Sequence, residues 1–150
     1  MSEALGRKLI ALAHQINRQC ARRIEEDGTV HPYLGYFVRD EHGLESAVLS
    51  VFQTVFGHTP YENVYHRAAA LMSKVADAHA FGDGKRTALH LGLAYLRALR
   101  VEIQPPTSEE GALLVIGLVE GTLSVDAAAD QLRSWTVIDK AGRRHRRGLQ

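Results

Sequence analysis

Residues 79–88, HAFGDGKRTA, decide how this chain of 150 residues folds and where its chemistry lies. Residues 65–80 carry apolar side chains at the spacing of a buried helix, and residues 87–100 repeat that spacing. Gly82 and Gly84 interrupt the pattern and are expected to end the first helix and supply positive φ angles in the connection. The stretch therefore predicts two buried helices joined by a short, glycine-containing turn.

The residue types in this turn suit phosphate chemistry. His79 could act as a base toward a hydroxyl, and Asp83 could hold a divalent cation. The start of the second helix offers unpaired N–H groups and a favourable dipole to an anion. We therefore expect a catalytic residue at His79, a metal ligand at Asp83, and a phosphate-binding set of Gly82, Gly84, Lys85 and Arg86. Residue types alone leave open a purely structural turn, because inactive helical proteins contain similar sequences.

The remaining pattern predicts an all-α fold. Helices are expected over residues 4–26, 44–56, 107–120 and 124–135, in addition to the two around the turn. Residues 28–39 contain glycine, proline and aromatic residues without helical spacing, and residues 101–103 form a brief extended piece. The prediction is a compact bundle of about six helices with a short irregular or β-like flap.

Length and composition predict one small domain. Hydrophobic residues make up 45% of the chain and charged residues 23%, both ordinary for a globular protein. Cys20 is the one cysteine, which excludes an intrachain disulfide. No signal-like or membrane-spanning apolar run is evident, so a cytoplasmic protein without membrane contact is expected. We expect a helical domain over residues 1–136 and a flexible basic tail over residues 137–150.

The turn resembles the signature of the Fic/Doc family, in its Doc (death-on-curing) branch, H-x-F-x-[DN]-[AG]-N-K-R-T-A. The resemblance extends over roughly residues 39–135, with a weaker match at residues 9–19. It is carried outside the turn by RD and GLESA (residues 39–47), QTVFG (53–57), AYLR (94–97) and GTLS (121–124).

The resemblance implies a role for each matching residue. His79 would be the general base, Asp83 the ligand of Mg²⁺, and Phe81 a buried anchor, while Gly84, Lys85 and Arg86 would cradle the phosphates. Many members transfer AMP to a protein hydroxyl, whereas the Doc branch phosphorylates a translation elongation factor and halts growth. Leu89, where AMP-transferring members carry a second arginine, favours the Doc branch. The resemblance also implies ATP and Mg²⁺ as cofactors and a protein as substrate. It further implies a small antitoxin that folds on binding, and a substrate-docking flap at residues 28–39.

This chain departs from the family at one position. The signature has an asparagine between the equivalents of Gly84 and Lys85, and this chain has none, so the loop is one residue short. Such a deletion rotates the residues after it by about 100° if the helix absorbs it. A catalytically inactive or repurposed binding module is therefore the alternative to an active enzyme.

Three further alternatives stay open. His66 and His90 flank the turn and could join His79 and Asp83 in a transition-metal site, although they lack the i, i+4 spacing of a helical zinc pair. The aromatic residues of segment 28–39 could pack in the core instead of forming a docking flap. The basic tail could contact nucleic acid, as a third function, although no aromatic residues interleave its charges.

Overall fold

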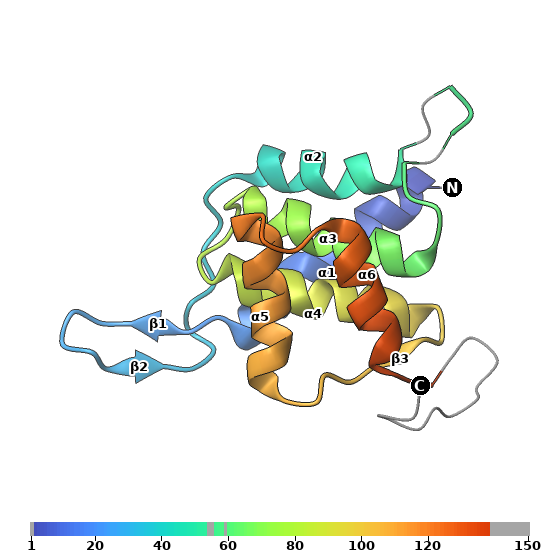
Figure 1. Cartoon of the computed structure of the whole chain (residues 1–150). Coiled ribbons are helices and arrows are strands. Elements are labelled where there is room, and N and C mark those ends of the chain that lie inside the picture. The colour runs from blue at the N-terminus through green and yellow to red at the C-terminus, as the bar shows by residue number, and fades with distance from the viewer. Residues whose placement is uncertain (1, 54–55, 59, 139–150) are drawn as a thin grey trace.

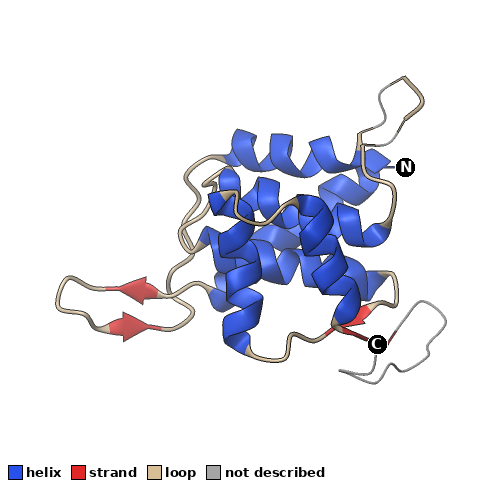
Figure 2. Cartoon of the chain, in the orientation of Figure 1, coloured by secondary structure: helices blue, strands red, loops and turns tan. Residues whose placement is uncertain are grey.

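The computed structural model describes residues 2–53, 56–58 and 60–138, and Figure 1 shows their arrangement. Six helices dominate these described residues, as predicted, and two small antiparallel strand pairs accompany them (Figure 2). The helices are α1 (Ser2–Cys20), α2 (Glu41–Phe52), α3 (Val64–Asp77), α4 (Gly84–Ala98), α5 (Ser108–Glu120) and α6 (Val125–Ser134). The strand pairs are β1 (Arg23–Ile24) with β2 (Val30–His31), and β3 (Glu102–Ile103) with β4 (Thr136–Ile138). The predicted all-α bundle is confirmed.

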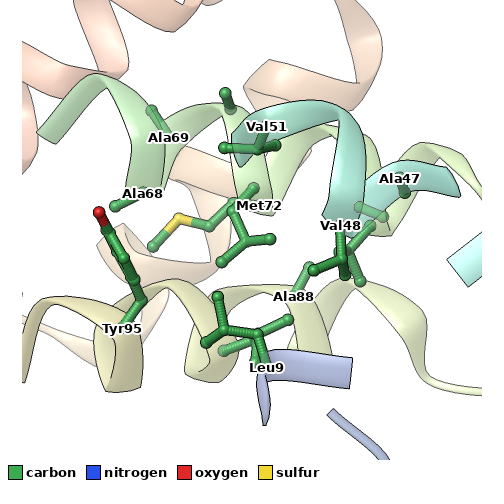
Figure 3. Close-up of a cluster of buried hydrophobic side chains, with 14 of the residues drawn as sticks. Leu9, Ala47, Val48, Val51, Ala68, Ala69, Met72, Ala88 and Tyr95 are labelled. Carbon is green, nitrogen blue, oxygen red and sulfur yellow. The ribbon is translucent and has the colours of Figure 1, made fainter. Parts of the chain in front are cut away.

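Helices α3 and α4 form the centre of the bundle. Helix α3 packs against α2, α5 and α6, while α4 packs against α1 and α5. Figure 3 shows side chains from four helices converging between them, among them Leu9, Val48, Met72 and Tyr95. A Cβ at Gly92 would lie 2.6 Å from Cγ of Met72, so only glycine lets the two central helices approach this closely.

Side chains cap most of the helices. The N-cap residues Asp40, Asn63, Thr107 and Ser124 each accept a hydrogen bond from a backbone N–H in the first turn of α2, α3, α5 and α6. Helix α4 differs, because its N-cap residue Asp83 makes no such bond with its side chain. The helix that carries the signature thus begins with unsatisfied donors.

The flap, predicted over residues 28–39, begins earlier in the structure and comprises the hairpin β1–β2 with the extended segment after it, up to residue 40. The hairpin stands out from the helical body in Figure 1, with no helix beside its strands. Tyr33 is 70% exposed and Phe37 is 59% exposed, so the alternative in which these aromatic residues pack in the core is wrong.

Several boundaries differ from the sequence prediction. Helix α2 runs over Glu41–Phe52 instead of residues 44–56. Helix α1 ends at Cys20 instead of continuing to residue 26, because the polar residues after Ala21 have no apolar face to bury and enter the hairpin. Strand β4 comes after α6 and pairs with β3, which closes the bundle next to the α4–α5 connection. Most of the predicted basic tail, residues 139–150, lies outside the described residues.

None of the helices in the described part of the chain is long and apolar enough to cross a membrane.

Candidate active site

The signature forms the connection between α3 and α4, and its backbone is unusual at two positions. His79 has a φ of 51° and Asp83 a φ of 56°, both in the left-handed region. The expectation that Gly82 and Gly84 would supply the positive φ angles is wrong, since neither has one. Aspartate and histidine tolerate this region better than most residues, and such conformations persist where the surroundings enforce them.

One half of the connection is buried and bonded to the flap. Phe81 is 2% exposed, and it forms an isolated antiparallel bridge with Val38. The N–H of Arg39 donates to the carbonyl of Ala80 at 2.7 Å, and the N–H of Gly82 donates to the carbonyl of Phe37 at 3.1 Å. The flap root and the connection therefore form one continuous piece of backbone structure.

Asn17 of α1 locks this piece in place. Its side chain is fully buried, and its Nδ2 donates to the carbonyl of Gly82 at 2.9 Å and to Oγ1 of Thr87 at 2.8 Å. Its Oδ1 accepts from the N–H of Phe37 at 3.4 Å. One amide group thus bridges the connection, the first turn of α4 and the flap, and its bond to Thr87 is buried.

The other half of the connection faces solvent. The side chain of His79 is exposed and has no hydrogen-bond or ion-pair partner in the described part of the chain. Thr87 is the first residue of α4 whose N–H bonds back into the helix, to the carbonyl of Asp83 at 3.2 Å. The three preceding amides, of residues 84–86, have no acceptor among the described residues. Together with exposed Lys85 they form a positive surface suited to an anion.

Arg86 is held in a fixed position beside this surface. One of its guanidinium nitrogens donates to the carbonyl of Cys20 at 3.4 Å and lies 3.9 Å from the Asp83 carboxylate. Only one nitrogen makes these contacts, which leaves the rest of the guanidinium fork for an anionic ligand.

The Asp83 carboxylate is partly committed. Its Oδ2 accepts a long bond of 3.4 Å from the N–H of Arg22 and faces Arg86, whereas Oδ1 receives no hydrogen bond from the described residues. Magnesium in nucleotide sites is held by one or two carboxylates together with phosphate oxygens and water. A single carboxylate with one open oxygen fits a cation that arrives with a nucleotide.

A pocket of about 770 Å³ adjoins the positive surface. Asp83, Lys85 and Arg86 lie at its charged end, and its lining does not include His79. The remaining wall comes from the C-terminal end of α1, Tyr33 of the flap, α4, the segment before α5, and α5 itself. Its largely apolar part is lined by Leu89, Leu93, Pro105, Ala112, Val115 and Ile116.

Two titratable groups in this pocket are held neutral. Burial raises the pKa of the Cys20 thiol, against a smaller opposing effect of its contact with Thr87. Desolvation lowers the pKa of His90, and the nearby cations Arg86 and Arg97 lower it further. The pocket therefore presents an uncharged thiol and an uncharged imidazole next to its cationic end at neutral pH.

The described residues do not form the transition-metal site that the sequence left as an alternative. His66 pairs with Asp126 of α6, with Nε2 3.0 Å from Oδ1. No cluster of three or more potential metal-binding side chains exists within residues 2–53, 56–58 and 60–138. His90 lies instead on the pocket wall.

Sequence reasoning missed several residues of this site. His14, Asn17 and the α5 wall of the pocket were given no role, although all of them surround the connection or its pocket. A signal existed for Asn17, because it is a polar residue directly after Ile16 on the apolar stripe of α1. The α5 wall had no such signal, since its pocket-lining residues are ordinary apolar ones.

Comparison with known proteins gives two matches. The sequence profile of the Fic/DOC family matches residues 10–96. The chain is also 31% identical over 108 residues to the Protein kinase doc of Escherichia phage P1, an alignment that covers 71% of this chain and 84% of that protein.

Proposed function

The chain belongs to the Fic/DOC family, and we propose that it is a Doc-like toxin that transfers a phosphoryl group from Mg-ATP to a hydroxyl side chain of a target protein. The observation that carries this proposal is the division of the signature into a buried half and an exposed half. Phe81 and Thr87 are buried, whereas the side chains of His79 and Lys85 are exposed to solvent. Reactive groups kept accessible on a rigid support are what transfer to a macromolecular substrate requires.

The positive surface at the start of α4 would bind the nucleotide phosphates. The free amides of residues 84–86, the charge of Lys85 and the open guanidinium edge of Arg86 all favour anionic oxygens. The adjoining pocket is large enough for a nucleoside, and its apolar wall suits an aromatic base. Mg²⁺, when bound by Asp83 and the phosphates, would neutralise part of the charge of the transferring group.

His79 would take the proton from the attacking hydroxyl. It lies outside the pocket, so a hydroxyl approaching from solvent can meet it without displacing the nucleoside. Its left-handed backbone at the end of α3 turns the residue away from the helix before the chain enters the buried half. The assignment of a phosphoryl rather than a nucleotidyl group rests on Leu89, in place of a second arginine, and on the relative being a protein kinase.

The proposed target is a translation factor, whose modification would arrest growth in the cytoplasm. A toxin of this kind needs a partner that restrains it, so the proposal includes a small antitoxin that covers the site. The exposed apolar side chains of the flap, including Ile24, Tyr33 and Leu34, supply a surface on which a protein substrate could be aligned.

The alternative is an inactive or repurposed binding module, because the loop lacks the family's asparagine. One observation favours activity over this alternative. The turn and the start of α4 are anchored at both ends by Asn17, so the shortened loop is held in a defined conformation.

The direct test is incubation of the pure protein with ATP, Mg²⁺ and a bacterial lysate, and then intact mass measurement of the modified proteins. The proposal expects a target that gains one phosphoryl group. A gain of one AMP would replace phosphoryl by nucleotidyl transfer. No gain, together with absent nucleotide binding, would leave the binding-module alternative.

A second chain with an asparagine inserted between Gly84 and Lys85 tests the shortened loop. If the natural loop is already competent, the insertion should leave the transfer rate unchanged or reduce it, because Asn17 would have to accommodate a longer turn. A large gain in rate would show that the deletion had impaired the enzyme.

A further inference from the structure

We propose that Tyr36 is a positioning residue, which His14 and Arg18 hold so that the flap keeps a fixed orientation over the catalytic connection. This inference rests on the proposed function and identifies how a protein substrate would be aligned. The hairpin itself has little support, because it projects from the helical body without a helix beside it (Figure 1). Contacts at its root must therefore set its direction.

The side chain of Tyr36 is held by two residues of α1. Its hydroxyl lies 3.0 Å from Nδ1 of His14, and it accepts a hydrogen bond from Arg18 at 3.3 Å. The guanidinium of Arg18 also lies 4.4 Å from the centre of the Tyr36 ring. Three interactions from α1 thus hold one side chain that is 37% exposed, although a merely solvated tyrosine needs none of them.

The orientation of the His14 ring is fixed by Glu41. Its Nε2 lies 2.9 Å from one carboxylate oxygen of Glu41 and 3.1 Å from the other, so Nε2 carries the hydrogen. In the neutral ring Nδ1 then accepts the hydrogen of the Tyr36 hydroxyl, which leaves that oxygen free to accept from Arg18. The directions of all three hydrogen bonds agree, and the first turn of α2 fixes the imidazole.

His14 also contacts the catalytic connection. Its ring lies nearly perpendicular to the ring of Phe81, with 5.2 Å between the centroids. Phe81 is two residues from His79 and pairs with Val38 of the flap. His14 therefore bonds to the flap through one ring nitrogen and packs its ring against Phe81, the buried anchor of the signature.

Backbone hydrogen bonds hold the flap root on both sides of Tyr36. The N–H of Gly35 donates to the carbonyl of Ala21 at 3.1 Å, and the backbone of Phe37 bonds to Asn17 and to Gly82. These backbone bonds fix the path of the chain on either side of Tyr36. The contacts of the Tyr36 side chain form a tether, a second, side-chain constraint on the orientation of this segment, beside its backbone bonds.

The test compares Tyr36→Phe with Tyr61→Phe. Tyr61 is a matched control, a half-buried tyrosine whose hydroxyl makes no hydrogen bond within the described residues. Transfer of labelled phosphoryl groups from ATP is measured against lysate concentration and, separately, against Mg-ATP concentration. Tyr36→Phe should raise the half-saturating lysate concentration about fivefold while the KM for Mg-ATP and the melting temperature stay unchanged. The control should match the wild type throughout.

His14→Phe provides the second variant, since it keeps an aromatic ring against Phe81 but removes both hydrogen bonds. It should reproduce the effect of Tyr36→Phe, and the double variant should be no worse than either single one. Equal loss of all kinetic parameters together with a lower melting temperature would show a structural role and overturn the inference.

Hydrogen exchange of the flap amides tests the tether without any target. Residues 34–38 should exchange about fivefold faster in Tyr36→Phe than in the wild type, while the amides of α3 and α4 stay unchanged. Unchanged exchange would overturn the tether. Absence of transfer in the wild type, with faster exchange in the variant, would contradict the proposed function alone.

Discussion

The two halves of the signature differ in almost every physical respect. Phe81 and Thr87 are buried and bound to α1 or the flap, whereas His79 and Lys85 are exposed. The buried half makes the contacts that hold α1, α4 and the flap together. The exposed half holds the side chains that could react or bind a ligand, and the fold leaves them accessible to solvent.

Within these ten residues, the side chains that stabilise the fold are therefore different from those proposed to take part in catalysis. A substitution in the exposed half should change catalysis and leave the fold intact. A substitution in the buried half should cost folding free energy first, and any loss of activity would result from that. Substitutions in each half, and chemical modification of the pocket, test whether the two halves affect stability and activity separately.

The largest effect is expected for His79→Ala. Removing a general base typically reduces a rate by about 10²- to 10⁴-fold, and here nothing in the described fold depends on the side chain. Transfer from Mg-ATP and growth arrest should disappear while the melting temperature falls only slightly, because alanine tolerates the left-handed φ of 51° less well than histidine. His42→Ala, at another exposed histidine, is the control. Retained growth arrest in the His79 variant would contradict the role of the imidazole.

The largest effect on stability is expected for Phe81→Ala. Truncation of a fully buried phenylalanine typically costs about 3–5 kcal/mol, and this one also loses its contact with His14. Denaturant unfolding should show this loss directly. Phe56→Ala should cost less than about 0.5 kcal/mol, because that ring is 97% exposed. Similar costs for the two variants would remove the distinction between the halves.

A smaller effect is expected for Lys85→Ala. The loss of one phosphate-binding cation should raise the KM for Mg-ATP about tenfold, corresponding to roughly 1.4 kcal/mol. The fold should gain slightly, because a cation in the first turn of a helix opposes the dipole. Lys8→Ala, on the exposed side of α1, should change neither quantity. A loss of stability in the Lys85 variant would run against the prediction.

The smallest effect concerns the Cys20 thiol, which lines the pocket. Its raised pKa keeps it protonated at neutral pH, so alkylation by iodoacetamide should be slow and should accelerate as the pH rises. Saturating Mg-ATP should slow the reaction further, by about threefold or more, if the nucleoside occupies the pocket. Equal alkylation rates with and without the nucleotide would place the nucleoside elsewhere.

The helices could be predicted because each has a local cause in the sequence. Apolar spacing marked α3 and α4, and Thr107 and Ser124 marked the starts of α5 and α6 as capping residues. The family itself was evident from the order of residues in the signature, and the comparisons confirm it.

The parts that could not be predicted depend on partners far apart in the chain. Asn17 bonds to groups 65 and 70 residues away, and His14 meets Tyr36 and Glu41 only after the flap has folded back on α1. The left-handed angles of His79 and Asp83 were also missed. Glycine adopts the left-handed region most easily, so the sequence pointed to Gly82 and Gly84. In the structure the tertiary bonds of the connection impose this conformation on His79 and Asp83 instead.

Calorimetric titration of the pure protein with Mg-ATP shows whether the surface at the start of α4 binds the nucleotide, and it needs neither a target nor an antitoxin. The exposed half of the signature should bind one Mg-ATP, His79→Ala should bind it equally well, and Lys85→Ala with Arg86→Ala should abolish binding in a folded chain. Absence of binding in the wild type, or equal binding by the double variant, would contradict the assignment of this surface to the nucleotide.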